Sequence, residues 1–176
     1  MEALKNVTLR VAGVIEESIV DGPGLRFVLF LQGCRTHCKG CQNPQTWDFE
    51  GGTAVSAEDI LSRIQDDPLV HGITFSGGEP FEQSAALLPL AEELKRRGYH
   101  LMAFSGYTFE QLLEKPSCRE LLSLLDLLVD GPFVEEQKSL DLRFRGSRNQ
   151  RILNMAASRE AGWKPVLDEL NDQAER

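Results

Sequence analysis

The chain has 176 residues, of which 41% are hydrophobic, so it can bury one core of ordinary size and is too short for two comfortable domains. Its formal net charge of −8 excludes a general binder of nucleic acids or anionic membranes, because such proteins need a basic face. The N-terminus has no signal-peptide hydrophobic region, and no apolar run approaches the roughly 18 residues that span a bilayer. We therefore expect a single cytoplasmic domain with no membrane or nucleic-acid partner.

The first part of the chain predicts two strands separated by a turn. Residues 4–15 alternate in part between apolar and polar side chains, as in a leading strand or an extended arm. Asp21-Gly22-Pro23-Gly24 is a turn by composition. Residues 25–31 are almost continuously apolar, which is typical of a strand buried on both faces in a parallel sheet.

Three of the four cysteines follow this strand in a Cys-x3-Cys-x2-Cys run formed by Cys34, Cys38 and Cys41. Closely spaced thiolates bind soft metal centres, and in a reducing compartment a metal explains them better than disulfides do. Three protein ligands leave one iron of a cubane cluster open, whereas a structural zinc ion normally has four. Spacing alone leaves both interpretations open, although His37 would complete a zinc site only by folding back into the same loop. Cys118 lies in a leucine-rich stretch and is expected to be a small buried hydrophobe.

The next elements lead to a second polar motif. After an irregular segment at 43–52, Ser56 is expected to cap a helix that runs to about residue 65. A strand at 72–76 then leads into Gly77-Gly78-Glu79-Pro80. The two glycines expose backbone groups at the strand end, and Glu79 can accept a hydrogen bond from an amine. The motif alone also fits an ordinary turn before a helix.

Strands and helices keep alternating through the rest of the core. The expected elements are a helix at 84–97 that buries Leu87, Leu88, Ala91 and Leu94, a strand at 99–104, a capping box at Thr108, a helix at 118–125 and a strand at 127–129. This alternation predicts an α/β fold with a mostly parallel sheet, either open or curved into an incomplete βα barrel. A full barrel takes about 250 residues, so this chain is too short to close one.

Beyond Asp130 the composition becomes basic. Asp141 is surrounded by five cations, which are Lys138, Arg143, Arg145, Arg148 and Arg151. This stretch is either a surface that faces a partner or a solvated loop in which one or two arginines form ion pairs.

Four separated motifs carry a resemblance to a known family. They are Asp21-Gly22-Pro23-Gly24, the Cys34–Cys41 run, Gly77-Gly78-Glu79-Pro80, and Asp130-Gly131-Pro132-Phe133 with Arg145-Gly146-Ser147-x-Asn149-Gln150-Arg151. The second and third motifs resemble those of the radical S-adenosylmethionine enzymes. With the other two, the chain is similar to the glycyl-radical-enzyme activases, in particular those of anaerobic ribonucleoside-triphosphate reductase. The resemblance covers residues 9–154 of a single domain at 1–176, and the role of the C-terminal tail at 155–176 is left open.

The resemblance implies an incomplete barrel of the radical S-adenosylmethionine type and a set of site residues. Cys34, Cys38 and Cys41 would hold a [4Fe–4S] cluster, with S-adenosyl-L-methionine on its fourth iron. Gly77, Gly78 and Glu79 would hold the methionine end of that cofactor. Gly40 stands where many members have a large side chain, so backbone contacts from Gly40 through Cys41 to Gln42 would hold the adenine. Asp21 would contact the target glycine segment, and Ser105 and Asp130 would line the same mouth on the ground of their position alone.

The activity that the resemblance implies is that of an activase. An electron from a low-potential donor such as flavodoxin would cleave S-adenosylmethionine, and the 5′-deoxyadenosyl radical would install a glycyl radical on anaerobic ribonucleoside-triphosphate reductase. One alternative is an activase of another glycyl-radical enzyme, such as pyruvate formate-lyase. A second is a radical enzyme for a small molecule, for which the chain offers little enclosure. A third is a zinc-stabilised interaction module without catalysis.

Overall fold

The computed structural model describes residues 2–172, so residue 1 and residues 173–176 of the predicted domain lie outside the described part. The strands are β1 (Thr8–Ser18), β2 (Arg26–Leu31), β3 (Thr53–Ser56), β4 (Gly72–Gly77), β5 (His100–Phe104), β6 (Leu127–Asp130) and β7 (Arg151–Asn154). The α-helices are α1 (Glu2–Lys5), α2 (Ala57–Gln65), α3 (Ser84–Arg96), α4 (Phe109–Leu113), α5 (Pro116–Leu122) and α6 (Met155–Glu160). Short 3-10 helices lie at Pro44–Thr46, Pro80–Gln83, Glu135–Gln137 and Glu169–Asn171.

Within residues 2–172 the strands form one seven-stranded sheet in the order β3-β1-β2-β4-β5-β6-β7. The four central strands, β2, β4, β5 and β6, are parallel to one another, as the alternation of strands and helices predicts. The flanking strands β1, β3 and β7 pair antiparallel. The α/β fold with a parallel centre is therefore confirmed. The sheet is open, and its curvature into an incomplete barrel stays a prediction.

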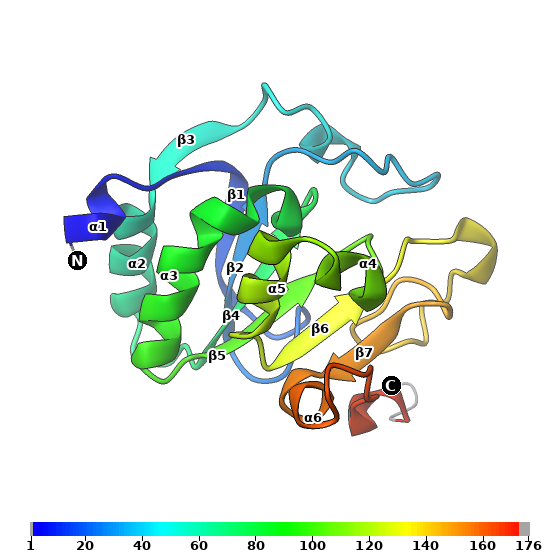
Figure 1. Cartoon of the computed structure of the whole chain (residues 1–176). Coiled ribbons are helices and arrows are strands. Elements are labelled where there is room, and N and C mark those ends of the chain that lie inside the picture. Colours follow the sequence, from blue (N-terminus) through cyan, green and yellow to red (C-terminus); the bar gives the residue numbers. More distant parts are fainter. Residues whose placement is uncertain (1, 173–176) are drawn as a thin grey trace.

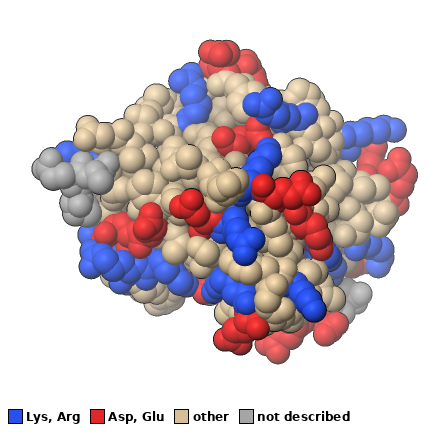
Figure 2. Space-filling model, in the orientation of Figure 1, with Lys and Arg blue, Asp and Glu red and all other residues tan. Residues whose placement is uncertain are grey.

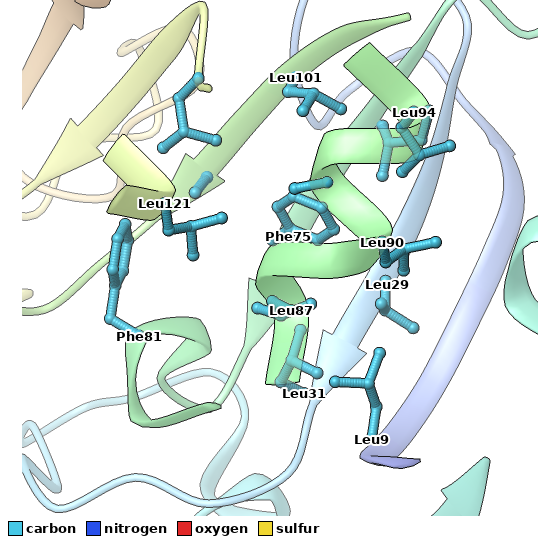
Figure 3. Packing of buried hydrophobic residues seen from close by; sticks show 14 of the residues in the cluster. Leu9, Leu29, Leu31, Phe75, Phe81, Leu87, Leu90, Leu94, Leu101 and Leu121 are labelled. Carbon is cyan, nitrogen blue, oxygen red and sulfur yellow. The ribbon is translucent and has the colours of Figure 1, made fainter. Parts of the chain in front are cut away.

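One face of the sheet carries the main hydrophobic core. Helices α2, α3 and α5 lie together over this face (Figure 1). Strand residues such as Leu29, Leu31 and Phe75 pack against Leu87 and Leu94 of α3 (Figure 3). Each of these side chains is fully buried, and burying a leucine or phenylalanine contributes about 1.5–3 kcal/mol. The opposite face has a smaller apolar cluster that includes Met102 and Val129.

The helix boundaries follow the local chemistry of the sequence. The Ser56 side chain caps α2 by accepting from the Asp59 N–H at 3.1 Å, as predicted. Thr108 and Gln111 form the predicted capping box at the start of α4. Leu88 of α3 was expected to be buried and is only half-buried, because Leu90, three residues after Leu87, completes the helix face that meets the sheet.

Three other expectations differ from the structure. The predicted leading strand at 4–15 is instead α1 followed by β1, which continues to Ser18. The irregular segment at 43–52 is followed by β3, which was not predicted. This short and partly exposed edge strand pairs with β1. The predicted helix at 118–125 is α5, which begins at Pro116 because proline is well suited to the first helical turn. No α-helix within the described residues is long and apolar enough to cross a membrane.

Candidate functional site

A cavity of about 220 Å³ lies beyond the carboxyl ends of the parallel strands. The loop after β2 lines it with Cys34, Cys38, Cys41 and Gln42, and the end of β4 contributes Gly77, Gly78 and Glu79. Ser105 after β5 and Gly131 after β6 complete the ring. Figure 1 shows the long loops after β2 and β6 projecting on the same side of the molecule. This edge is where α/β folds gather ligand sites, as the order of motifs in the sequence predicts.

Backbone hydrogen bonds join the start of the cysteine loop to the residues that follow it. The Gly33 N–H donates to the Thr46 carbonyl at 2.6 Å, and the Cys34 N–H donates to the Trp47 carbonyl at 3.1 Å. His37 has a positive φ of 48°, which is uncommon for a residue with a side chain, and its ring stacks on Trp47 with centroids 4.4 Å apart. The imidazole therefore lies against the indole and does not fold back among the cysteines.

The three clustered cysteines face the cavity and are partly accessible. Burial raises the pKa of the Cys38 thiol, while a hydrogen bond from the Phe133 backbone opposes this and the neighbouring cysteines reinforce it. The Asn43 N–H donates to the Cys41 sulfur at 3.4 Å. Among the described residues, no three His, Cys, Asp or Glu side chains stand close enough to share one metal ion. Three thiols around one cavity match the three protein ligands of a cubane cluster with one open iron, whereas a structural zinc ion normally has four ligands. Cys118 is buried away from them under α3, as predicted.

Gly77 and Gly78 are required by the close approach of β4 to the cysteine loop. Gly77 has φ +102°, and a Cβ there would lie 2.5 Å from the Leu31 nitrogen. A Cβ on Gly78 would lie 2.5 Å from the Gly33 carbonyl oxygen. The Gly78 N–H donates to the Leu31 carbonyl and the Glu79 N–H to the Gly33 carbonyl, both at 2.8 Å. These two N–H groups therefore join the two motifs to each other, which corrects the expectation that they were exposed for a ligand.

Glu79 places a carboxylate in the wall of the cavity at 1% exposure. One oxygen accepts from the Gly106 N–H at 2.7 Å, and the other accepts from the Ser105 hydroxyl at 2.9 Å and the Phe81 N–H at 3.2 Å. Burial raises the pKa of Glu79 to about 7, and the three donors only partly offset this. No ion pair joins this carboxylate to a cation among residues 2–172, so an ammonium group in the cavity would supply one.

Three predicted residues stand outside the wall of the cavity. The Asp130 carboxylate is directed to the start of α4, where it accepts from the Phe109 N–H at 2.7 Å and from Arg151 Nε at 3.0 Å. Asp130 was expected to line the mouth, and only the following Gly131 does so. Asp21 precedes β2, and its carboxylate accepts from the Ser18 hydroxyl at 2.6 Å. Gly40 turns at φ +79° beside the Glu135 side chain.

Sequence reasoning missed the amide that holds the loop after β6. Gln150 Oε1 accepts from the Gly146 and Ser147 N–H groups at 2.8 and 3.1 Å, and its Nε2 donates to the Gly131 carbonyl at 3.0 Å. Asn149 Nδ2 donates to the Pro132 carbonyl at 2.7 Å. These bonds fix the backbone that brings Phe133 to Cys38. The signal in the sequence is the pair of adjacent amides, Asn149 and Gln150, between Arg148 and Arg151.

The basic stretch is partly explained by ion pairing. Arg151 pairs with Asp130 and with Glu110. Arg145 is half-buried and donates to the carbonyls of Gln150 and Asn171. The interpretation in which one or two of these arginines form ion pairs is therefore correct for Arg151.

The class of protein follows from comparison with known families. A family model described as "4Fe-4S single cluster domain" matches residues 20–153. The anaerobic ribonucleoside-triphosphate reductase-activating protein of Haemophilus influenzae is 34% identical over an alignment of 142 residues, which covers 76% of this chain and 90% of the relative. The protein of the same name from Escherichia coli K12 is 33% identical, with 76% and 91% covered. The chain belongs to this 4Fe-4S family and, within it, to the anaerobic ribonucleoside-triphosphate reductase-activating proteins.

Other similar proteins carry other names. The pyruvate formate-lyase-activating enzyme of Clostridium pasteurianum is 35% identical over an alignment of 127 residues, which covers 67% of this chain and 52% of that enzyme. Among solved structures, QueE from Escherichia coli is similar at a TM-score of 0.48 with 21% identity, over 61% of this chain and 57% of QueE.

Proposed function

We propose that this chain activates an anaerobic ribonucleoside-triphosphate reductase, the protein named in its relatives, by installing a glycyl radical. In this proposal Cys34, Cys38 and Cys41 hold a [4Fe–4S] cluster that leaves one iron for S-adenosylmethionine. When bound, the reduced cluster supplies the electron that cleaves S-adenosylmethionine to methionine and the 5′-deoxyadenosyl radical, which removes a hydrogen atom from a glycine of the reductase. The single observation that carries the proposal is that three clustered cysteines and one buried carboxylate face the same cavity.

The residues of this chain bind and orient the cofactor. Glu79 accepts hydrogen bonds from the methionine ammonium, since its carboxylate is buried in the wall without a cation. Ser105 supports this role by donating to the same carboxylate, so it acts through Glu79. Gln42 lines the cavity beside Cys41 and supports the assignment of the adenine to backbone between Gly40 and Gln42. We do not assign Asp130 to cofactor binding, because Arg151 and the Phe109 N–H already hold its carboxylate.

The remaining parts of the proposal concern the surroundings of the site. We propose that the sheet curves as an incomplete barrel around the face opposite α2, α3 and α5, where Met102 and Val129 form the smaller cluster. Asp21 is assigned to the target segment of the reductase, and the exposed Ile19 and Val20 beside it support a contact with protein. A flavodoxin-like donor supplies the electron, and the reaction takes place in the cytoplasm.

The first experiment measures iron, acid-labile sulfide and zinc in protein purified without oxygen, followed by a dithionite-reduced assay for 5′-deoxyadenosine. We expect about four iron and four sulfide per chain and formation of the product. Substitution of any one of the three clustered cysteines by alanine should abolish both, whereas Cys118→Ala should keep both, because that thiol is buried under α3. Stoichiometric zinc without sulfide or product would establish the zinc-module alternative instead.

The partner is tested separately by electron paramagnetic resonance of the reduced mixture. A glycyl radical on the reductase, and none on pyruvate formate-lyase, is the expected result. The coverage supports this choice, since the chain spans 90% of the Haemophilus influenzae relative but 52% of the pyruvate formate-lyase-activating enzyme. A radical on pyruvate formate-lyase alone would assign the other partner.

A further inference from the structure

A hairpin at 138–147 projects from the loop after β6 and is firmly anchored. Its two arms are joined by a bridge between Lys138 and Ser147, and the Arg148 N–H donates to the Gln137 carbonyl at 2.9 Å. Ser147 is completely buried at its base. The Phe144 ring is buried in the smaller apolar cluster with Met102. The hairpin therefore holds its tip in a defined position.

The tip of the 138–147 hairpin carries a leucine that has no role in the fold. Leu140 is 88% exposed, more than any other large hydrophobic residue among those described. An exposed apolar side chain held on a fixed turn gains free energy only when another surface covers it. The local backbone does not need it, since the turn is made by the Asp141 N–H, which donates to the Ser139 hydroxyl at 3.3 Å.

The charges around the hairpin are positive in an acidic protein. Lys138 and Arg148 are exposed at its base, and in the described part of the chain neither has a carboxylate partner. Glu135 pairs with Lys39, while Glu136 and Asp141 are exposed nearby, so the excess of cations around the hairpin lies between residues 138 and 148. Figure 2 shows how acidic and basic side chains alternate over the face in view. With a net charge of −8 on the chain, an acidic partner surface is attracted only where cations gather locally.

The hairpin stands at the mouth of the cavity. Gly146 in one arm and Gln150 just beyond it line the cavity, together with the cysteine loop. A protein whose segment reaches this cavity must pass the hairpin. On the proposed function, that protein is the reductase.

We propose that the 138–147 hairpin docks the reductase, with Leu140 entering an apolar pocket whose acidic rim meets Lys138 and Arg148. This inference rests on the proposed function for the identity of the partner. It adds a contact surface outside the cofactor cavity, so cofactor cleavage without the reductase does not depend on it.

The test uses the full chain with its cluster reconstituted and compares Leu140→Asp and Arg148→Glu with the parent protein. Affinity for the reductase is measured without turnover, and glycyl radical yield is measured at limiting activase. Leu140→Asp should raise the Kd about tenfold or more, the factor expected when one leucine is no longer buried. Arg148→Glu should raise the Kd at low salt and have a smaller effect at high salt, because the attraction is screened. Formation of 5′-deoxyadenosine without the reductase should be unchanged in both.

The matched control is Leu69→Asp, which adds the same charge at a leucine that is 64% exposed before β4, at the other end of the strands. Its Kd should equal that of the parent. The proposal is overturned if Leu140→Asp binds the reductase as tightly as the parent, or if Leu69→Asp weakens binding to the same extent. Failure of the parent to cleave S-adenosylmethionine would refute the proposed function instead. The two results are distinguishable because affinity for the reductase is measured without turnover.

Discussion

Replacing Glu79 by glutamine should remove a pH dependence of stability that burial imposes on the protein. The wild-type carboxyl has a pKa of about 7 in the folded state, mainly because burial disfavours its charge, against 4.5 as its ordinary value. A raised pKa means that the folded state holds the proton more tightly than the unfolded state does. The stabilisation is therefore complete below pH 4.5 and is lost as the pH rises through 7.

The size of the effect follows from the shift. A displacement from 4.5 to about 7 corresponds to about 3 kcal/mol in total, of which about 2–3 kcal/mol falls between pH 5 and pH 8. Burial also lowers the pKa of His100, so this group contributes a pH dependence of its own. It is present in both proteins, so its contribution cancels in the difference between wild type and Glu79→Gln. Glutamine keeps one acceptor oxygen but loses the hydrogen bonds made to the other carboxylate oxygen, and this cost does not vary with pH.

The assay is urea unfolding of the two proteins at pH 5, 6, 7 and 8, without oxygen and before cluster reconstitution. We expect the difference in unfolding free energy to shift by about 2–3 kcal/mol in favour of Glu79→Gln as the pH rises from 5 to 8. A difference that stays constant across this range would refute the argument, because the carboxyl would then have the same pKa in the folded and unfolded states.

Two further predictions concern polar side chains that hold backbone carbonyls. Gln150→Leu should release the loop at Gly131, so the variant should keep less of its cluster through gel filtration. The control is Arg148→Ala, an exposed position in the same segment, which should retain its iron. Equal retention of iron in both variants would argue against the role of the amide. Arg26→Met should cost at least about 2–3 kcal/mol in urea unfolding, because the buried guanidinium donates to Thr74 and to three backbone carbonyls that would lose their partner. An unfolding free energy within 1 kcal/mol of wild type, the scale of one ordinary hydrogen bond, would contradict this account.

Structural features that depend on residues close together in the chain could be predicted from the sequence. Apolar runs identified β2, β4 and β6, and side-chain caps located α2 and α4, because these features depend on neighbours a few residues away. The grouping of the cysteines with Glu79 also followed, since both motifs end parallel strands. The partner of Asp130 was not predictable, because Arg151 is its neighbour only through the pairing of β6 with β7. The role of Gln150 was missed because, besides the nearby Gly146 and Ser147 N–H groups, it holds the Gly131 carbonyl 19 residues earlier in the chain.

The contact between Gly78 and Gly33 limits how this site can be rebuilt or transferred. A Cβ on Gly78 would lie 2.5 Å from the Gly33 carbonyl oxygen, and the Glu79 N–H donates to that same oxygen. The cysteine loop and the Gly-Gly-Glu turn are thus two halves of one interlocked unit, although Gly33 and Gly78 are 45 positions apart in the chain. A designer who moved the cysteine run alone onto another sheet would transfer the ligands without the backbone that supports them. The smallest transferable piece is the adjacent strand pair β2 and β4 with both of their terminal loops.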